Sequence, residues 1–273
     1  MQLTADTARR PSGRRASSPP AARTVGAEAL RVVDLTKWYG SVHALDSVGL
    51  TIAYGEVVAL VGDNGAGKSS LINCIGGVLE PDAGAILVDG HDVAMGSVRD
   101  ANELGICTVH QDSTLADNLS AVENLFLGRE LTRGFGPFRR VDAARMRKRT
   151  QETIARLGIS TIADVGTRVG QLSGGQRQSV AVGRTMLGDF GIVLLDEPTT
   201  GLSVGACARV MDAVRELRAR GAAVLIVSQN IDEVFDVADR IVVLHLGRLA
   251  AEFRRSEVTP EDVMAAVMGM TLR

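Results

Sequence analysis

Apolar residues fall along this chain mostly in short runs of strand length. Continuous apolar runs at residues 57–61, 192–195 and 222–227 alternate with segments whose apolar residues recur at helical spacing, such as 204–220 and 231–238. Runs that are apolar at every position indicate strands buried on both faces, as in a parallel sheet covered by helices. The pattern therefore predicts an α/β fold with a mostly parallel sheet.

Other stretches predict smaller elements around this sheet. Residues 30–35 and 48–52 alternate between apolar and polar positions, which is typical of half-buried strands and predicts a small antiparallel β subdomain. We also expect strands at 85–90 and 106–111, a helix at 98–104, a hairpin at 241–250 and a closing helix at 260–268.

The middle of the chain, about residues 112–185, predicts an inserted helical subdomain. Ser120 and Glu123 form a capping-box pattern that opens a helix, and residues 142–157 carry helix-forming residues with apolar positions at helical spacing. Between these helices, residues 131–140 form a loop with two Phe and three Arg. This loop is either a partner surface or a hinge whose rings tuck under neighbouring helices.

Composition and charge give no sign of a nucleic-acid partner and favour a cytoplasmic protein. The chain has 273 residues, 45% of them hydrophobic, and a formal net charge of −2, so global charge gives no sign of a nucleic-acid partner. The three cysteines, Cys74, Cys107 and Cys207, are far apart and are interpreted as reduced, buried residues of a cytoplasmic protein.

Two observations concern membranes and the N-terminus. No apolar run approaches the roughly 20 residues needed to cross a bilayer, so we expect that the chain itself does not span a membrane. Residues 1–28 are rich in Arg, Pro and Ser and lack the apolar core of a signal peptide. They are expected to be a disordered extension, with a basic arm that touches anionic lipid as the alternative.

The strongest motif is the sequence G-D-N-G-A-G-K-S at residues 62–69, directly after the apolar run 57–61. Glycines let the backbone bring its N–H groups to a phosphate at a helix N-terminus, Lys68 supplies a point charge, and Ser69 is the expected Mg²⁺ ligand. The alternative is a glycine-rich turn that only bends the chain. It does not explain why two glycines, a lysine and a serine all stand at the spacing of the phosphate-binding motif. The predicted nucleotide-binding residues here are Gly62, Asn64, Gly65, Gly67, Lys68, Ser69 and Ser70.

A second motif follows the buried strand at 192–195. Asp196 is placed to orient Mg²⁺ through water, and the adjacent Glu197 is placed to polarise an attacking water. Two neighbouring carboxylates at this position favour hydrolysis of the nucleotide over transfer to a bound acceptor.

A third motif, L-S-G-G-Q at residues 172–176, opens a helix that is expected to run through Met186. A serine and two glycines at a helix N-terminus predict a second anion site. With all three motifs present in this order, the chain resembles the ATP-binding subunit of an ABC transporter from about Leu30 to its C-terminus. The resemblance implies a P-loop NTPase fold with ATP and Mg²⁺ as cofactors.

The resemblance also implies roles for single residues. Ser173, Gly174, Gly175 and Gln176 would contact ATP bound to a second subunit, in a head-to-tail dimer. Gln111 would touch Mg²⁺ and relay to a membrane partner.

For the adenine ring, the resemblance implies stacking on Tyr39. The adjacent Trp38 is the alternative.

Residues 117–130 and 232–240 are similar to bacterial carbohydrate importers of the monosaccharide branch. This finer resemblance implies a peripheral protein at the cytoplasmic face of the cell membrane. Its partners would be a transmembrane permease and a second ATP-binding subunit that forms a homodimer with it. A solute-binding protein would be an indirect partner, and nucleic acid would not be one.

Two positions depart from the family pattern. Residues 200–203 lack the usual aspartate, and Gln229 stands where a histidine normally contacts the γ-phosphate. A glutamine amide donates a neutral hydrogen bond but cannot become cationic. Gln229 therefore predicts a slowed ATPase that still binds MgATP and dimerises, with a tolerated variant in a fully active enzyme as the alternative.

Three functions stay open from the sequence. The first is the energy-coupling ATPase of a sugar importer, and the second is an ATP-dependent dimerising module with negligible hydrolysis. The third is a soluble ATPase that acts on nucleic acid or ribosomes. Relatives of this third kind usually carry two nucleotide-binding units in one chain, whereas this chain has one.

Overall fold

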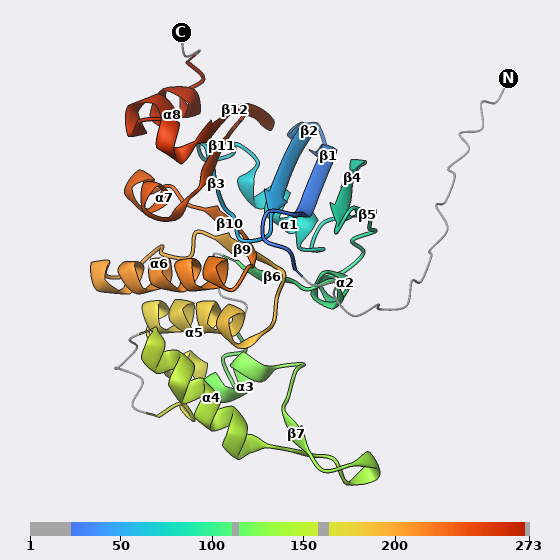
Figure 1. Ribbon diagram of the computed structural model, residues 1–273, viewed down its shortest axis with the longest axis vertical. Helices are drawn as coiled ribbons and strands as arrows, with labels where there is room; N and C mark the ends of the chain where they lie inside the picture. The colour runs from blue at the N-terminus through green and yellow to red at the C-terminus, as the bar shows by residue number, and fades with distance from the viewer. Residues whose placement is uncertain (1–22, 111–114, 158–163, 271–273) are drawn as a thin grey trace, which may run out of the picture.

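The computed structural model describes residues 23–110, 115–157 and 164–270 (Figure 1). Its central sheet has the strand order β12-β11-β3-β10-β9-β6, and every neighbouring pair is parallel except β11 with β12. This confirms the predicted α/β fold with a mostly parallel sheet. The six strands are β3 (Val57–Val61), β6 (Ile106–Val109), β9 (Ile192–Asp196), β10 (Ala223–Val227), β11 (Arg240–His245) and β12 (Arg248–Arg254).

Two apolar cores cover the two faces of this sheet, which is why its strands are apolar at every position. Along β3, Val57, Ala59 and Val61 point into one core, whereas Val58 and Leu60 point into the other. The helices that pack around the sheet are α1 (Lys68–Ile75), α2 (Val98–Glu103), α6 (Val204–Ala219), α7 (Ile231–Val237) and α8 (Pro260–Val267).

A second, antiparallel sheet lies beside α1, with the order β2-β1-β4-β5. It contains β1 (Glu28–Tyr39), β2 (Val42–Ala53), β4 (Ala83–Val88) and β5 (His91–Asp92). The first two strands are much longer than the predicted segments 30–35 and 48–52. Register shifts and the positive φ of Asp34 and Ser47 interrupt the alternation of buried and exposed residues. A prediction based on that alternation therefore made both strands too short.

The middle of the chain forms α3 (Ala121–Phe126), α4 (Ala143–Arg156) and α5 (Gly174–Leu187) in the lower lobe of Figure 1. These helices pack closely at Gly183, where a Cβ would lie 3.3 to 3.4 Å from side-chain atoms of Leu125, Thr153 and Leu157. A thin hairpin of β7 (Thr132–Arg133) and β8 (Arg140–Val141) projects from this lobe. Three short 3₁₀ helices complete the elements, namely η1 (Gly136–Phe138), η2 (Val169–Gln171) and η3 (Arg255–Glu257).

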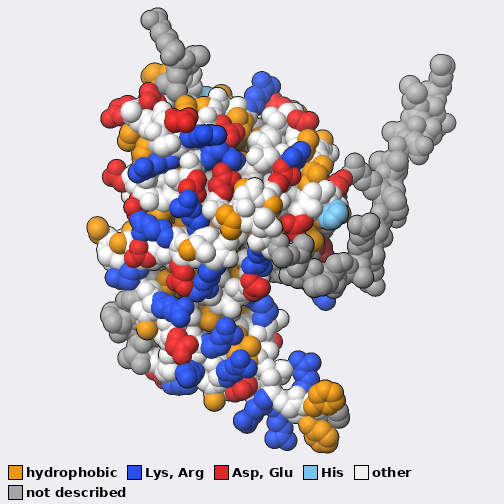
Figure 2. Space-filling model, viewed as in Figure 1, with side chains coloured by type: hydrophobic (Ala, Val, Ile, Leu, Met, Phe, Trp, Pro, Cys, Tyr) orange, Lys and Arg blue, Asp and Glu red, His pale blue; other side chains and the backbone are white. Residues whose placement is uncertain are grey.

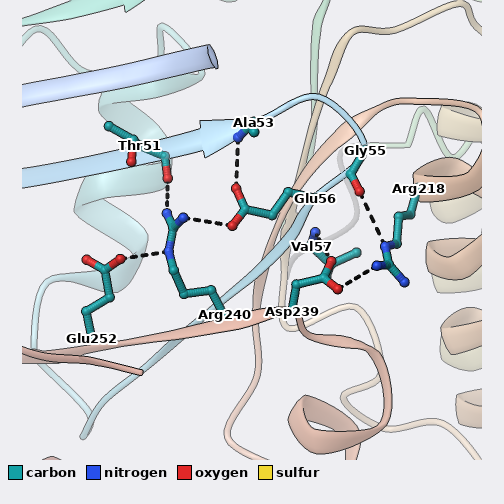
Figure 3. A network of polar contacts seen from close by, with 9 residues as sticks. All are labelled: Thr51, Ala53, Gly55, Glu56, Val57, Arg218, Asp239, Arg240 and Glu252. Atoms are coloured by element: carbon teal, nitrogen blue, oxygen red, sulfur yellow. Dashed lines mark hydrogen bonds and ion pairs between the residues drawn. The ribbon is translucent and has the colours of Figure 1, made fainter. Parts of the chain in front are cut away.

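Arg240, at the start of β11, joins the two sheets (Figure 3). Its guanidinium pairs with Glu56 at 2.7 Å and with Glu252 at 2.8 Å, and it also donates to the carbonyl of Thr51 at the end of β2. Arg240 is therefore shared by β2, β11, β12 and the turn that enters β3.

Asp239 fixes the start of β3 from the other side (Figure 3). Its carboxylate accepts a hydrogen bond from the N–H of Val57 at 2.9 Å and pairs with Arg218 of α6 at 2.6 Å. Arg218 also donates to the carbonyl of Gly55 at 3.3 Å. Since β3 is only five residues long, these contacts at its start also position the loop at its end.

The N-terminal segment is folded from Arg23 onward. The N–H of Gly26 donates to the carbonyl of Tyr54, and the N–H of Tyr54 donates to the carbonyl of Ala27. The side chain of Arg23 forms an ion pair with Asp189 at 2.6 Å. Residues 23–28 of the expected extension thus lie against the body, whereas residues 1–22 are outside the described part of the chain. Within the described ranges, no helix is both long and apolar enough to cross a bilayer.

Candidate active site

The loop between β3 and α1 is built so that only glycine fits at two positions. At Gly62, with φ +154°, a Cβ would lie 2.2 Å from the carbonyl oxygen of Leu244. At Gly67, with φ +104°, a Cβ would lie 2.4 Å from the carbonyl oxygen of Ala44. Both contacts are with backbone, so the loop is pressed between β11 and β2 and cannot relax to admit a side chain.

Lys68 is the first residue of α1 and is 6% exposed. Its Nζ donates to the carbonyl oxygens of Gly62 at 2.8 Å and Asp63 at 2.9 Å, which holds the ammonium inside the loop. Burial lowers the pKa of Lys68, and the charges of Glu197, Asp196 and Asp63 oppose this shift. No side chain caps α1 and no acid lies in its first turn, so its N-terminal N–H groups and dipole complement an anion.

Asp196, at the end of β9, is 4% exposed and faces the same loop. Burial and the charge of Glu197 raise its pKa, while a hydrogen bond from Ser69 and the nearby side chains of His110 and Lys68 oppose this shift. Its Oδ1 is buried and has no hydrogen-bond partner among the described residues. A buried, unpaired carboxylate oxygen beside a serine hydroxyl fits a hard divalent cation such as Mg²⁺.

The protein alone does not surround such a cation. Among the described residues there is no group of three or more His, Cys, Asp or Glu side chains that could hold a metal ion. Mg²⁺ is commonly held by one or two protein ligands together with substrate phosphates and water. The residues present therefore fit a cation that arrives with a nucleotide.

Glu197 has the left-handed backbone conformation, with φ +47°. For a residue other than glycine this costs on the order of 1–3 kcal/mol and is found where a site needs a particular orientation. The N–H of Glu197 donates to the carbonyl of Val227 at 3.0 Å, and its Oε2 accepts from the hydroxyl of Thr200 at 3.1 Å. The carboxylate is thus held at the edge where β9 and β10 end.

Gln229 links Glu197 to the phosphate loop. Its Nε2 donates to Glu197 Oε1 at 2.5 Å and to Asn64 Oδ1 at 3.1 Å. An amide nitrogen carries two hydrogens, so these two bonds use its whole donor capacity. The structure therefore brings three predicted residues together in a contact that sequence reasoning did not anticipate.

A second carboxylate supports the loops that carry Glu197 and Gln229. Glu233 Oε2 accepts from Thr199 Oγ1 at 2.7 Å and from Ser228 Oγ at 3.0 Å, which ties the loop after β9 to the loop after β10. Sequence reasoning missed these three residues, and also Thr200. For Ser228, Thr199 and Thr200 the signal was available, because polar residues in the loops after buried parallel strands meet at one edge of the sheet. Glu233 lies in α7 and had no such signal.

The motif at residues 172–176 is not brought to this loop. It opens α5, which lies in the lower lobe apart from α1 (Figure 1). Ser173 accepts from the N–H of Gln176 at 3.3 Å, and the Gln176 side chain accepts from the N–H of Ser173 at 2.9 Å. This is a capping box, and its S-x-x-Q pattern is readable from the sequence. Among the described residues, no atom outside its own helix comes within 4 Å of a Cβ built on Gly174, and a Cβ on Gly175 would meet Leu202 at 3.1 Å.

The remaining predicted residues are placed as follows. Trp38 stacks on His43 with ring centroids 3.7 Å apart, whereas Tyr39 is 46% exposed at the end of β1. The stack covers one face of Trp38, but the two side chains are almost equally exposed, 45% for Trp38 and 46% for Tyr39. Stacking of adenine on Tyr39 stays a prediction. Ser70 is half-buried in the first turn of α1. Gln111 lies outside the described residues.

Taken together, the glycine loop, Lys68, and the carboxylates at the end of the adjoining sheet define a P-loop nucleoside triphosphatase. The comparisons with known proteins agree with this class and also identify the family. The family model for the ABC transporter matches residues 45–200. The chain therefore belongs to the ABC transporter family, and it is an ATP-binding, ATP-hydrolysing member of it.

Similar proteins support this assignment. The fructose import ATP-binding protein of Rhizobium meliloti is 40% identical over 238 residues, which are 86% of this chain and 92% of that protein. The xylose/arabinose import ATP-binding protein of Sulfolobus acidocaldarius is 39% identical over 243 residues, 89% and 95% of the two chains. A solved dimeric ABC cassette in a post-hydrolysis state with ADP and phosphate superposes with a TM-score of 0.70 at 27% identity, covering 83% and 98%. The predicted resemblance to carbohydrate importers is confirmed.

Proposed function

We propose that this chain is the energy-coupling ATPase subunit of a sugar importer. The observation that carries the proposal is the placement of Glu197 at the phosphate loop, held by Thr200 and Gln229. The names of the similar proteins support a sugar as the solute. In this proposal the chain works at the cytoplasmic face of the membrane with a transmembrane permease, a second copy of itself, and indirectly a solute-binding protein.

Each residue of the site has its own role in this proposal. Lys68 and the N–H groups at the start of α1 bind the β- and γ-phosphates, and Ser69 and Asp196 would hold Mg²⁺. When bound, Mg²⁺ neutralises charge that develops on the phosphates. Glu197 accepts a hydrogen bond from the attacking water and orients it toward the γ-phosphate.

The second phosphate-facing surface comes from a partner copy in this proposal. Ser173, Gly174 and Gly175 lie at the start of α5, apart from the loop of their own chain, and Gly174 has open space around it. A head-to-tail dimer would place these residues over the nucleotide of the other subunit. The similarity to a solved dimeric cassette supports this arrangement.

Gln229 sets the rate in this proposal. Its amide donates to Glu197 and Asn64, so it must release one of these bonds before it can donate to a γ-phosphate. The amide also stays neutral, so it stabilises developing negative charge less than a cationic imidazole would. Loss of one preorganised donor costs about 10²–10³ in rate, and a weaker donor should cost less than that.

The rate proposal is tested with Gln229→His. We expect steady-state phosphate release to rise while ATP affinity stays the same, with Gln229→Ala as the matched control that should release phosphate more slowly than either. A Gln229→His turnover at or below that of the natural protein would contradict it. If the natural protein dimerises with ATP but releases no phosphate above the Glu197→Gln background, the chain is instead an ATP-dependent dimerising module.

The transport proposal has its own test. The tagged chain is purified from membranes of its host in mild detergent, and we expect a multi-span membrane protein to co-purify in stoichiometric amount. Purification without such a protein would contradict a role in import and leave the ATPase assignment intact.

A further inference from the structure

The hairpin of β7 and β8 is the part of the molecule for which the nucleotide site gives no reason. Its two strands pair with Thr132 opposite Val141 and Arg133 opposite Arg140, and its base closes where the N–H of Asp142 donates to the carbonyl of Leu131 at 2.7 Å. Figure 1 shows that it extends away from the helical lobe as a thin arm.

The tip of this arm has a defined backbone. The N–H of Phe138 donates to the carbonyl of Phe135 at 3.2 Å, which forms the short helix η1. Gly134 has φ +95°, and a Cβ there would lie 2.5 Å from the carbonyl oxygen of Phe138, so the turn requires glycine. The tip therefore presents its side chains from a fixed frame.

Two aromatic rings stand in water at this tip. Phe135 is 93% exposed and Phe138 is 78% exposed, the two least buried aromatic side chains of the described residues. The alternative that these rings tuck under neighbouring helices is therefore wrong. Figure 2 shows the two rings at the end of the arm with basic side chains around them.

The charge around the rings is of one sign. The arm from Leu131 to Val141 contains three arginines and no acid. None of Arg133, Arg139 and Arg140 forms an ion pair with another described residue, and Arg139 donates instead to the hydroxyl of Thr132 at 2.8 Å. The first turns of α4 add further exposed basic side chains, which are Arg145, Lys148 and Arg149.

Arg133 and Arg140 are directly opposite each other in the hairpin. Like charges at such a cross-strand pair destabilise a hairpin in water. An anionic surface removes this repulsion, because each guanidinium can then bind its own phosphate oxygen. The arrangement thus favours an anionic partner.

The shape of the arm favours a lipid surface as that partner. The rings sit on a narrow, projecting tip (Figure 2). Aromatic rings on such a tip can enter the headgroup region of a bilayer, which deforms around them, while arginines stay at phosphate level. A protein partner would instead need a pocket shaped for two rings.

We propose that the β7–β8 hairpin docks on an anionic membrane, with Phe135 and Phe138 inserted among the lipid headgroups and Arg133, Arg139 and Arg140 bound to lipid phosphates. This contact orients the helical lobe toward the bilayer independently of a permease. It goes beyond the proposed transport function and can be measured on the isolated full chain.

The test is vesicle flotation of the full chain, with phosphatidylcholine vesicles that do or do not contain phosphatidylglycerol. We expect binding only with phosphatidylglycerol. Phe135→Ser with Phe138→Ser should lower the partition coefficient at least tenfold. Arg133→Gln with Arg140→Gln should lower it about 25-fold, since each arginine near an anionic surface contributes roughly fivefold.

Two matched controls separate the hairpin from other surfaces. Arg9→Gln with Arg10→Gln changes the net charge by the same amount in the basic N-terminal segment, and Met268→Ser with Met270→Ser removes two other exposed apolar side chains. Both controls should bind vesicles more tightly than the hairpin variants. If the arginine control abolishes binding while the hairpin variants bind normally, the N-terminal segment is the lipid-binding arm and the proposal is wrong.

A positive signal comes from Phe135→Trp, which keeps an aromatic ring at the tip. Its fluorescence should shift to shorter wavelength when anionic vesicles are added, whereas Met268→Trp should not shift. Absence of a shift, or association of the hairpin with the permease protein in vesicles of pure phosphatidylcholine, would overturn the proposal. Unchanged ATP binding in all hairpin variants shows that they are folded.

Discussion

The chain contains two glycine-rich helix N-termini, at α1 and α5, and they differ in how the first turn of the helix is capped. At α1 the N-cap residue Gly67 offers no side chain to the helix, and Lys68 lies buried among carbonyl oxygens and near three acids. At α5 the helix is closed by its own side chains, because Ser173 and Gln176 form a reciprocal capping box.

The two helix N-termini also differ in what surrounds them within one chain. The N-terminus of α1 lies beside Asp196, Glu197 and Gln229, which come from neighbouring strand ends. At the N-terminus of α5, Gly174 has open space among the described residues, and Gly175 faces Leu202. In the proposed head-to-tail dimer, this capped end of α5 would meet the nucleotide bound to the other subunit.

The largest effect is expected for Glu197→Gln. The amide cannot accept a proton from the attacking water, so turnover should fall about 10²–10⁴-fold while ATP binding is retained. Single-turnover phosphate release and equilibrium ATP binding measure the two quantities. Equal losses of binding and turnover would show that Glu197 holds the loop together and does not act on water.

Lys68→Ala should weaken ATP binding by about 10- to 150-fold, because a hydrogen bond to a charged group contributes about 1.5–3 kcal/mol. Isothermal titration with MgATP measures the change. The matched variant is Ser173→Ala, which should leave the ATP affinity of an isolated subunit unchanged. A similar loss in both variants would mean that the two helix N-termini bind the same nucleotide within one chain.

Gly67→Ala and Gly174→Ala compare the two helices through their backbones. At Gly67 a Cβ meets a backbone carbonyl at 2.4 Å and φ is +104°, so we expect a loss of about 2–3 kcal/mol in the free energy of unfolding. At Gly174 nothing lies within 4 Å, and the loss should be close to zero. Urea unfolding measures both, and a destabilised Gly174→Ala variant would show that the start of α5 is packed and not open.

A smaller loss of stability than that of Gly67→Ala is expected for Ser173→Ala. Removing the N-cap hydroxyl should cost about 1 kcal/mol, with Ser120→Ala, the cap of α3, as the matched control of similar size. Urea unfolding again measures the change. ATP-dependent dimerisation should weaken in Ser173→Ala and stay unchanged in Ser120→Ala, and equal dimerisation would argue against a role of Ser173 beyond its own helix.

The elements that could be predicted from the sequence are those with a strong local signal. The strands β3, β9 and β10 are apolar at every position, and the loop at 62–69 carries its chemistry in eight consecutive residues. The long hairpin of β1 and β2 was only partly predicted, because its register shifts interrupt the alternation that marks a strand. The capping box at Ser173 and Gln176 was readable and was overlooked in favour of the anion-site interpretation.

The sequence by itself determined the class of chemistry, since Lys68, Ser69, Asp196 and Glu197 stand in motifs whose spacing is set by single turns of the backbone. It also has Gln229 where the family resemblance implies a histidine. Only the tertiary structure revealed that Gln229 joins Glu197 to Asn64, 165 residues earlier in the chain, and that Phe135 and Phe138 stand exposed on an arm. Local motifs follow from short-range backbone geometry, whereas contacts between distant segments exist only after the sheet has brought the ends of its strands to one edge.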